Sequence, residues 1–106
     1  MIKHLIPLTV VVALLGGCAN WVKLDPGAEN IRLVDPQHVT ACHRLGQTTT
    51  SVRERVAAYQ RKPGRVEEEL ANLARNSALE MGGDTIVAAG PVDDGQRRFF
   101  VYRCAR

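Results

Sequence analysis

Residues 66–89 read VEEELANLARNSALEMGGDTIVAA, and this stretch decides the fold. Apolar and small side chains recur in it at the spacing of one helix face, which predicts an amphipathic helix over Val66–Met81. The expected buried stripe consists of Val66, Leu70, Leu73, Ser77 and Met81, widened by Ala74 and Ala78. Two glycines at 82–83 supply a left-handed stop, and residues 85–89 (TIVAA) then predict a short apolar strand.

The acidic triplet Glu67, Glu68 and Glu69 is expected in the first turn of this helix. Carboxylates are favourable there because the N-terminal end of a helix dipole is positive. A metal site is the alternative, but consecutive residues point in different directions around a helix and do not converge on one ion. We therefore interpret the triplet as a solvated helix start.

The flanking segments predict strands. Residues 91–95, with Asp93-Asp94-Gly95 at the tip, indicate a hairpin turn, and Arg97–Cys104 predicts the last strand. That strand carries aromatic residues on both faces, so we expect it to be central or covered on one side by the helix.

Upstream, residues 31–34 predict a first strand and residues 39–45 a second. Gly46 breaks or bulges that run, and residues 47–52 predict a third strand or an extension.

These elements predict an α+β fold: a small antiparallel or mixed sheet of about four to five strands packed on one amphipathic helix. The stretch between the third strand and the helix carries the highest density of positive charge. Its cations are Arg53, Arg55, Arg61, Lys62 and Arg65. We favour a solvated loop balanced by the acidic triplet. The alternative is contact with anionic headgroups, lipopolysaccharide phosphates or an acidic protein, since arginine suits bidentate anion contacts.

The N-terminal segment predicts the compartment. Lys3 and His4 precede an apolar run that ends at Leu15, and that run is too short to cross a bilayer. It is typical of a signal peptide. The following Gly16-Gly17-Cys18 is similar to a bacterial lipobox, which implies that residues 1–17 are removed and that Cys18 carries acyl chains.

A lipobox cysteine carries three acyl chains, which would anchor the protein stably because two membrane signals already suffice. Ala19, in place of an aspartate, implies transfer to the outer membrane, facing the periplasm. Residues 18–30 contain turn formers and predict a lipidated tether, so that residues 31–106 form the domain. Cleavage leaves 89 of the 106 residues, enough for one small domain. Removal of Lys3 with the leader leaves 13 of the 14 basic residues against 11 acidic ones. This weak excess of positive charge does not favour a nucleic acid as the partner.

Two cysteines, Cys42 and Cys104, remain for pairing in an oxidising compartment, which predicts a structural disulfide. Closing a loop of about sixty residues stabilises a fold by roughly 4 kcal/mol in the chain-entropy model. A redox or metal-binding thiol pair is the alternative, but the spacing is not Cys-x-x-Cys.

No catalytic constellation stands out. His38 and His43 are the only histidines after the leader, and Ser51 and its neighbouring threonines have no nucleophile-elbow context. We therefore expect no enzyme, no cofactor and no metal. A metal or small-ligand protein using both histidines and the basic stretch is the runner-up, and a hydrolase that depends on His43 or Ser51 is a third reading.

The chain resembles the small bacterial lipoproteins of the family known as domain of unknown function 4156. The residues that carry the resemblance are Ile31–Val34, Ala41–Gly46, Leu73–Asn76 with Ala78, Met81–Ile86 and Val101–Cys104. The resemblance strengthens the Cys42–Cys104 pairing and implies no catalytic residue. The arrangement is also distantly similar to the folded domain of the Rcs stress-sensing outer-membrane lipoprotein. That likeness concerns architecture, which does not transmit function.

Taken together, the sequence predicts a lipid-anchored envelope protein with a non-enzymatic interaction, structural or stress-signalling role. Its expected partners are the membrane, through Cys18, and an envelope protein, peptidoglycan or lipopolysaccharide.

Overall fold

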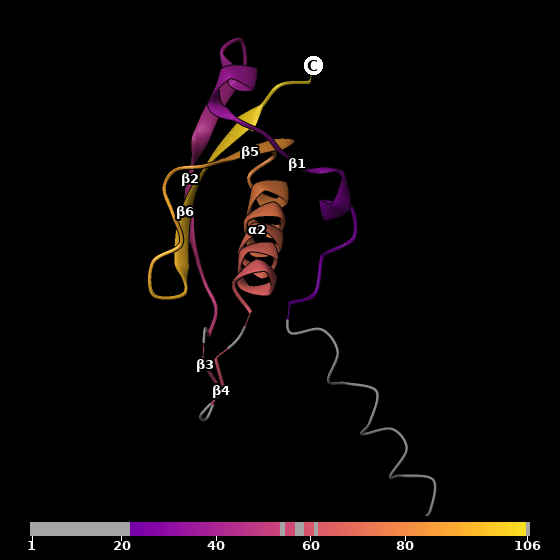
Figure 1. The fold of residues 1–106 in the computed structure, drawn as a ribbon. Coiled ribbons are helices and arrows are strands. Elements are labelled where there is room, and N and C mark those ends of the chain that lie inside the picture. The colour runs from indigo at the N-terminus through magenta and orange to yellow at the C-terminus, as the bar shows by residue number, and fades with distance from the viewer. Residues whose placement is uncertain (1–21, 54, 57–58, 61, 106) are drawn as a thin grey trace, which may run out of the picture.

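A four-stranded mixed sheet with one long helix on its face forms the body of the protein (Figure 1). The structure is a computed structural model and describes residues 22–53, 55–56, 59–60 and 62–105. The sheet order is β1-β5-β6-β2, and a two-stranded hairpin, β3–β4, extends from one end. The strands are β1 (Arg32–Leu33), β2 (His43–Ser51), β3 (Arg55–Val56), β4 (Tyr59–Gln60), β5 (Thr85–Ala88) and β6 (Gln96–Arg103). The predicted α+β class is confirmed.

The helix α2 spans Pro63–Glu80, so it begins three residues before the predicted start. Proline suits the first helical position because its ring fixes φ and its missing N–H has no partner there. The acidic triplet consequently lies beyond the first turn, and Glu69 is buried rather than solvated. The predicted stop is confirmed: Gly82 has φ 82°, and the Gly83 N–H donates to the Ala78 carbonyl at 2.8 Å.

The buried stripe of α2 is rotated from the predicted one. Leu73 and Ser77 are only half-buried, and Met81 is 37% exposed. The buried positions are Val66, Glu69, Leu70, Ala71, Ala74 and Ala78. The apolar residues of this set pack against the fully buried Ile86, Phe99 and Val101 of the sheet. Three alanines in this stripe let the helix backbone approach the sheet closely, so the small residues determine which face turns inward.

The strand β6 is central, as its aromatic residues on both faces predicted. It pairs antiparallel with β5 on one side and with β2 on the other, while β1 pairs parallel with β5. The turn between β5 and β6 lies where the sequence predicted it. Asp94 and Gly95 both have positive φ, and Asp93 exchanges two backbone hydrogen bonds with Gln96. This is the two-residue hairpin geometry that matches strand twist.

The predicted strand over residues 39–45 is wrong in its first half. Residues Pro36–Val39 form a 3-10 turn, η3, and β2 begins only at His43. Pro36 starts η3 because it fixes φ and cannot donate a hydrogen bond to a strand. From His43 the strand is continuous through Ser51, so residues 47–51 extend it rather than form a third strand. The register shift between Arg44 and Gly46 confirms the bulge.

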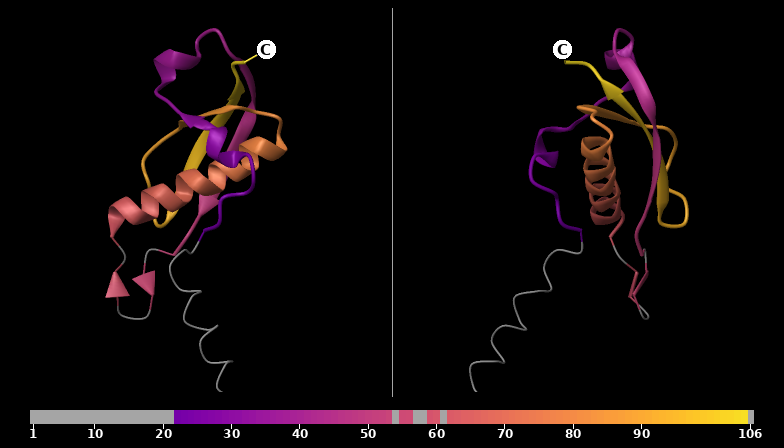
Figure 2. Two further views of the ribbon diagram at one scale, coloured as in Figure 1. Left: turned by 90° about the vertical axis from the view of Figure 1, so that its right-hand side faces the viewer. Right: turned by 180° about the vertical axis from the view of Figure 1, so that it is seen from behind.

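The segment before β1 belongs to the folded domain. It includes a short 3-10 turn, η2 (Ala28–Asn30), and it lies against α2 on the side away from the sheet (Figure 2). Ala28 is fully buried, and the side-chain amide of Asn76 donates to the Lys23 carbonyl while its oxygen accepts from the Asp25 N–H. The described part of the expected tether is therefore bound to the helix from Lys23 onward.

Candidate functional site

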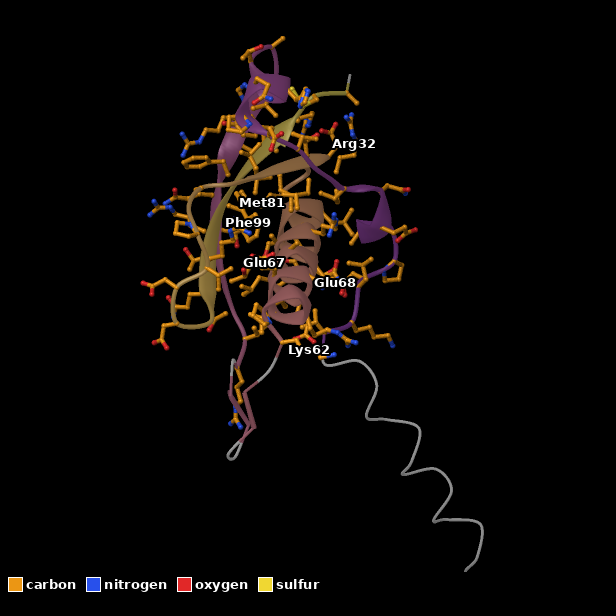
Figure 3. The ribbon with its side chains drawn as sticks, in the orientation of Figure 1. Arg32, Lys62, Glu67, Glu68, Met81 and Phe99 are labelled. Carbon is orange, nitrogen blue, oxygen red and sulfur yellow. A yellow bond between two sulfur atoms is a disulfide. The ribbon has the colours of Figure 1, made fainter. Side chains whose placement is uncertain are left out.

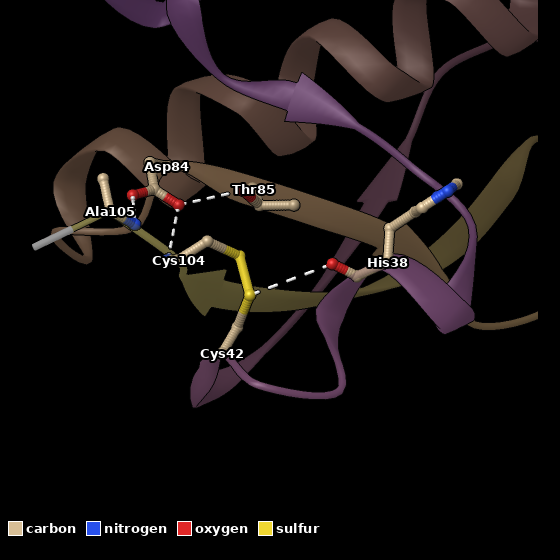
Figure 4. Close-up of a disulfide and its surroundings, with 6 residues drawn as sticks. All are labelled: His38, Cys42, Asp84, Thr85, Cys104 and Ala105. Carbon is tan, nitrogen blue, oxygen red and sulfur yellow. Dashed lines mark hydrogen bonds between the residues drawn. A yellow bond between two sulfur atoms is a disulfide. The ribbon is translucent and has the colours of Figure 1, made fainter.

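The disulfide predicted from the sequence closes one end of the sheet (Figure 4). Cys42 precedes β2 and Cys104 follows β6, and their Cα atoms are 4.5 Å apart. The bond spans a sequence separation of 62 residues and joins the two strands that share the longest register in the sheet. It therefore fixes the last strand to the strand that forms the sheet edge.

Asp84 supports the same corner from the loop between α2 and β5. Its Oδ1 accepts hydrogen bonds from the Cys104 N–H at 2.8 Å and from the Thr85 hydroxyl at 2.9 Å. Its Oδ2 accepts from the Ala105 N–H at 2.8 Å (Figure 4). One carboxylate thus holds the chain after β6, where the strand ladder ends and backbone N–H groups would otherwise lack partners.

The pKa of Asp84 is lowered from its ordinary value of 3.8. Partial burial acts in the opposite direction, since it disfavours the charged form. The backbone N–H groups of Cys104 and Ala105, the Thr85 hydroxyl and the charge of Arg103 together outweigh it. The arrangement stabilises an ionised carboxylate, and it has the character of a structural clamp rather than of a proton-transfer site.

The histidines named in the runner-up reading do not form a metal site with Cys42. Both His38 and His43 are exposed, and Cys42 is committed to the disulfide. The Cys42 sulfur lies 4.0 Å from the His38 carbonyl oxygen, a contact only, because a disulfide sulfur carries no proton. Within the described residues no group of three His, Cys, Asp or Glu side chains is placed to hold a metal ion. Ser51, named in the hydrolase reading, is exposed at the end of β2.

The predicted cationic stretch is divided between three elements. Arg53 follows β2, Arg55 lies in β3, and Lys62 and Arg65 flank the start of α2, with Arg61 outside the described residues. Arg53, Lys62 and Arg65 are exposed. The solvated loop that we favoured for this stretch is wrong from Pro63 onward, because the helix has already begun there.

A further cation joins this set from a distant part of the sequence. Lys23 is exposed, and its segment reaches the same end of the molecule as the β3–β4 hairpin and the start of α2 (Figures 1 and 3). We name the surface formed by Lys23, Arg53, Lys62 and Arg65 the basic end. Cys18, the predicted lipidation site, lies outside the described residues.

A shallow cleft borders the β5–β6 turn, with a volume of about 510 Å³. It is lined by Thr49, residues 89–93 and Gln96–Arg98. Arg97 Nε donates to the Gly90 carbonyl at 2.7 Å, so this guanidinium holds the turn in place. The cleft is open, and about half of its lining is polar, unlike the enclosed and mostly apolar pockets that typically bind small molecules.

Sequence reasoning misses two residues that organise these features. Asp84 has no second acid beside it that would mark a catalytic pair. Its position directly after Gly82-Gly83, however, indicates a polar side chain that bonds to backbone in the turn from helix to strand. Asn76 lies within the helix, where periodicity gives it no role. Its contact with Lys23 joins positions 53 residues apart, a relationship that no local pattern reveals.

No helix in the described ranges combines the length and the apolar character needed to cross a bilayer. No solved structure matches the chain, and the architectural likeness to the Rcs lipoprotein stays a prediction. The chain is similar to the uncharacterized protein YjeI of Escherichia coli K12, of Escherichia coli O6:H1 and of Shigella flexneri. Each is 26% identical over 100 residues, which cover 94% of this chain and 86% of the relative. The family model described as "Domain of unknown function (DUF4156)" matches residues 22–104, and the chain therefore belongs to this family.

Proposed function

We propose that this protein is a lipid-anchored lipoprotein of the bacterial envelope with a non-enzymatic role as an interaction, structural or stress-signalling module. The observation that carries the proposal is the short distance in sequence between the predicted anchor and the folded domain. Lys23 is already hydrogen-bonded to α2, five residues after Cys18. A stable disulfide-closed domain placed next to a lipobox is the arrangement expected of an anchored envelope module.

The disulfide supports the same compartment. Disulfides form and persist in oxidising spaces such as the bacterial periplasm and are rare in the cytosol. Cys42 and Cys104 lie close enough to be bonded with the flanking strands in register. Among the described residues, the polar groups at this corner are occupied in holding backbone rather than in activating a nucleophile.

Crosslinking in intact envelopes, followed by purification of the full chain, tests the interaction role. The control is a protein with the same leader and the same residues 18–22 fused to an unrelated periplasmic domain, since it reaches the same membrane. We expect this chain to capture a protein, glycan or lipid partner that the control does not. Failure to capture any partner specific to this chain would contradict an interaction role.

Membrane placement has its own test. Changing Ala19 to Asp is expected to retain the protein at the inner membrane, whereas Ala19→Ser leaves it in the outer membrane. Separation of the two membranes by density, followed by immunodetection, measures the distribution. An identical distribution for both variants would contradict the assignment to the outer membrane.

A further inference from the structure

The basic end lies where the chain leaves the folded domain toward its predicted lipid anchor. The described chain begins at Val22, beside the β3–β4 hairpin and the start of α2, and the C-terminus lies at the opposite end (Figures 1 and 2). Lys62 is seen at this end of α2 in Figure 3. Cations separated by up to 42 positions in sequence, from Lys23 to Arg65, are thus gathered around one exit point.

From this placement we propose that the basic end faces the membrane and binds the anionic headgroups of phospholipids. The inference rests on the lipid anchor of the proposed function and adds an orientation and a binding surface to it. The chain from Cys18 to Lys23 covers five residue steps, which reach at most about 18 Å when fully extended. The helix α2 alone, with 18 residues, is about 27 Å long. Because the folded domain is longer than this tether, the domain stays close to the membrane surface.

The helix dipole does not explain why these cations are placed here. Lys62 is the N-cap of α2 without a side-chain capping bond, and Arg65 lies in the first turn. Positive charge is unfavourable at this end of a helix dipole, typically by about 0.3–1 kcal/mol for each residue. Serine, aspartate or glutamate at these positions would stabilise the helix better. A ligand with negative charge would instead be attracted both by the two cations and by the positive end of the helix dipole.

The acids of the triplet on α2 lie closer to Arg65 than to Lys62. Glu69 is only 5% exposed, so it contributes little to the surface. Glu67 and Glu68 are exposed but lie five and six residues beyond Lys62, about 7–9 Å farther along the helix axis. Figure 3 shows both on the body of the helix, displaced from Lys62 toward the C-terminal end of α2. Lys62 therefore lies more than one helical turn before each of the three acids.

The test uses the full mature chain with Cys18→Ser, so that acyl chains do not mask the contribution of the protein surface. Co-sedimentation with phosphatidylcholine vesicles, with and without phosphatidylglycerol, measures partitioning. We expect binding only to the anionic vesicles, weakened by salt. Each basic residue near such a surface contributes about a fivefold increase in affinity, so Lys62→Gln with Arg65→Gln should lower partitioning about 30-fold.

The matched control changes Arg32 and Arg44 to Gln, which removes the same charge from exposed positions in β1 and β2, far from the basic end. This control should lower partitioning only slightly. Equal losses in both variants would overturn the proposal, because they would reflect net charge alone. Absence of binding to anionic vesicles would also overturn it and would direct the search to lipopolysaccharide or an acidic protein. Mass spectrometry of the native chain reports acylation independently, so failure of the anchor and failure of this surface are distinguishable.

Discussion

The Oδ1 atom of Asp84 accepts a hydrogen bond from the backbone N–H of Cys104 at 2.8 Å, so one carboxylate holds the residue that closes the disulfide. The same side chain also accepts from the Ala105 N–H. The end of β6 is consequently fixed twice, covalently through Cys42 and electrostatically through Asp84. The disulfide and the hydrogen bonds of Asp84 can be removed separately by mutation. Each removal therefore has its own expected effect on stability.

Changing Asp84 to Asn should lower the free energy of unfolding by about 1–2 kcal/mol, because hydrogen bonds to a charged group are lost while the side-chain volume is kept. In asparagine one of the two carboxylate oxygens is replaced by an NH2 donor, so the Cys104 and Ala105 N–H groups cannot both keep the acceptor that they have in Asp84. Urea unfolding at neutral pH measures the change. Asp35→Asn is the control, since Asp35 is exposed and forms no side-chain capping bond, and its effect should stay within about 0.5 kcal/mol.

The contribution of Asp84 should depend on pH in a defined direction. Its pKa in the folded state lies below the unfolded value of about 3.9, so the unfolded chain binds the proton more readily. The stabilisation is therefore fully present above pH ~4 and is lost as the pH falls through the folded pKa. The stability difference between the wild type and Asp84→Asn should narrow over that acidic range. A difference that grows on acidification would contradict the clamp.

Removal of the disulfide should cost about 4 kcal/mol, the value of the chain-entropy model for a loop of this length. The comparison uses Cys42→Ser with Cys104→Ser in a Cys18→Ser background, so that no free thiol remains. Denaturant unfolding of the oxidised parent and of this variant gives the difference. A loss below about 1 kcal/mol would show that the bond does not stabilise the fold.

The two glycines near the ends of α2 should respond oppositely to alanine. A Cβ on Gly83 would lie 2.6 Å from Val101 Cγ1 and 3.0 Å from the Tyr102 carbonyl oxygen, whereas one on Gly64 has nothing within 4 Å. Gly83→Ala should destabilise by about 1–3 kcal/mol through overpacking. Gly64→Ala should stabilise by about 0.5 kcal/mol, because alanine loses less entropy in a helix. Thermal unfolding of both variants checks the signs, and a stabilising Gly83→Ala would refute the close approach of Gly83 to β6.

Adjacent aromatic residues of β6 should differ in their contribution. Phe99 is fully buried under α2, and Phe100 is half-buried on the other face with the Arg44 guanidinium 3.9 Å from its ring centroid. Phe99→Ala should cost about 3–5 kcal/mol, and Phe100→Ala about 1–2 kcal/mol. Denaturant unfolding of the two variants measures both. Equal costs would contradict the assignment of the two faces.

Features that depend on local chemistry could be predicted from the sequence. The helix, its glycine stop and the Asp94-Gly95 turn follow from periodicity and from residues that accept positive φ, and all three are confirmed. The disulfide followed from two remaining cysteines and an oxidising compartment. The class of the fold followed in turn, because one amphipathic helix and several short strands have few ways to bury their apolar faces.

Features that depend on distant partners could not be predicted. The parallel pairing of β1 with β5 joins segments about fifty residues apart, and Ala28 and Asn76 fix the N-terminal segment through contacts of similar range. Local composition marked that segment as a tether because it contains turn formers. The segment 53–65 resembled a loop because it is rich in charged residues, and its placement at the same end of the molecule as the segment of Lys23 depends on the tertiary fold.

Mass spectrometry of the protein isolated from its natural envelope tests the central claim most directly. We expect a chain that begins at Cys18, carries acyl groups on that residue and contains the Cys42–Cys104 bond. A chain that retains residues 1–17, or one that begins at an unmodified Cys18, would contradict the account.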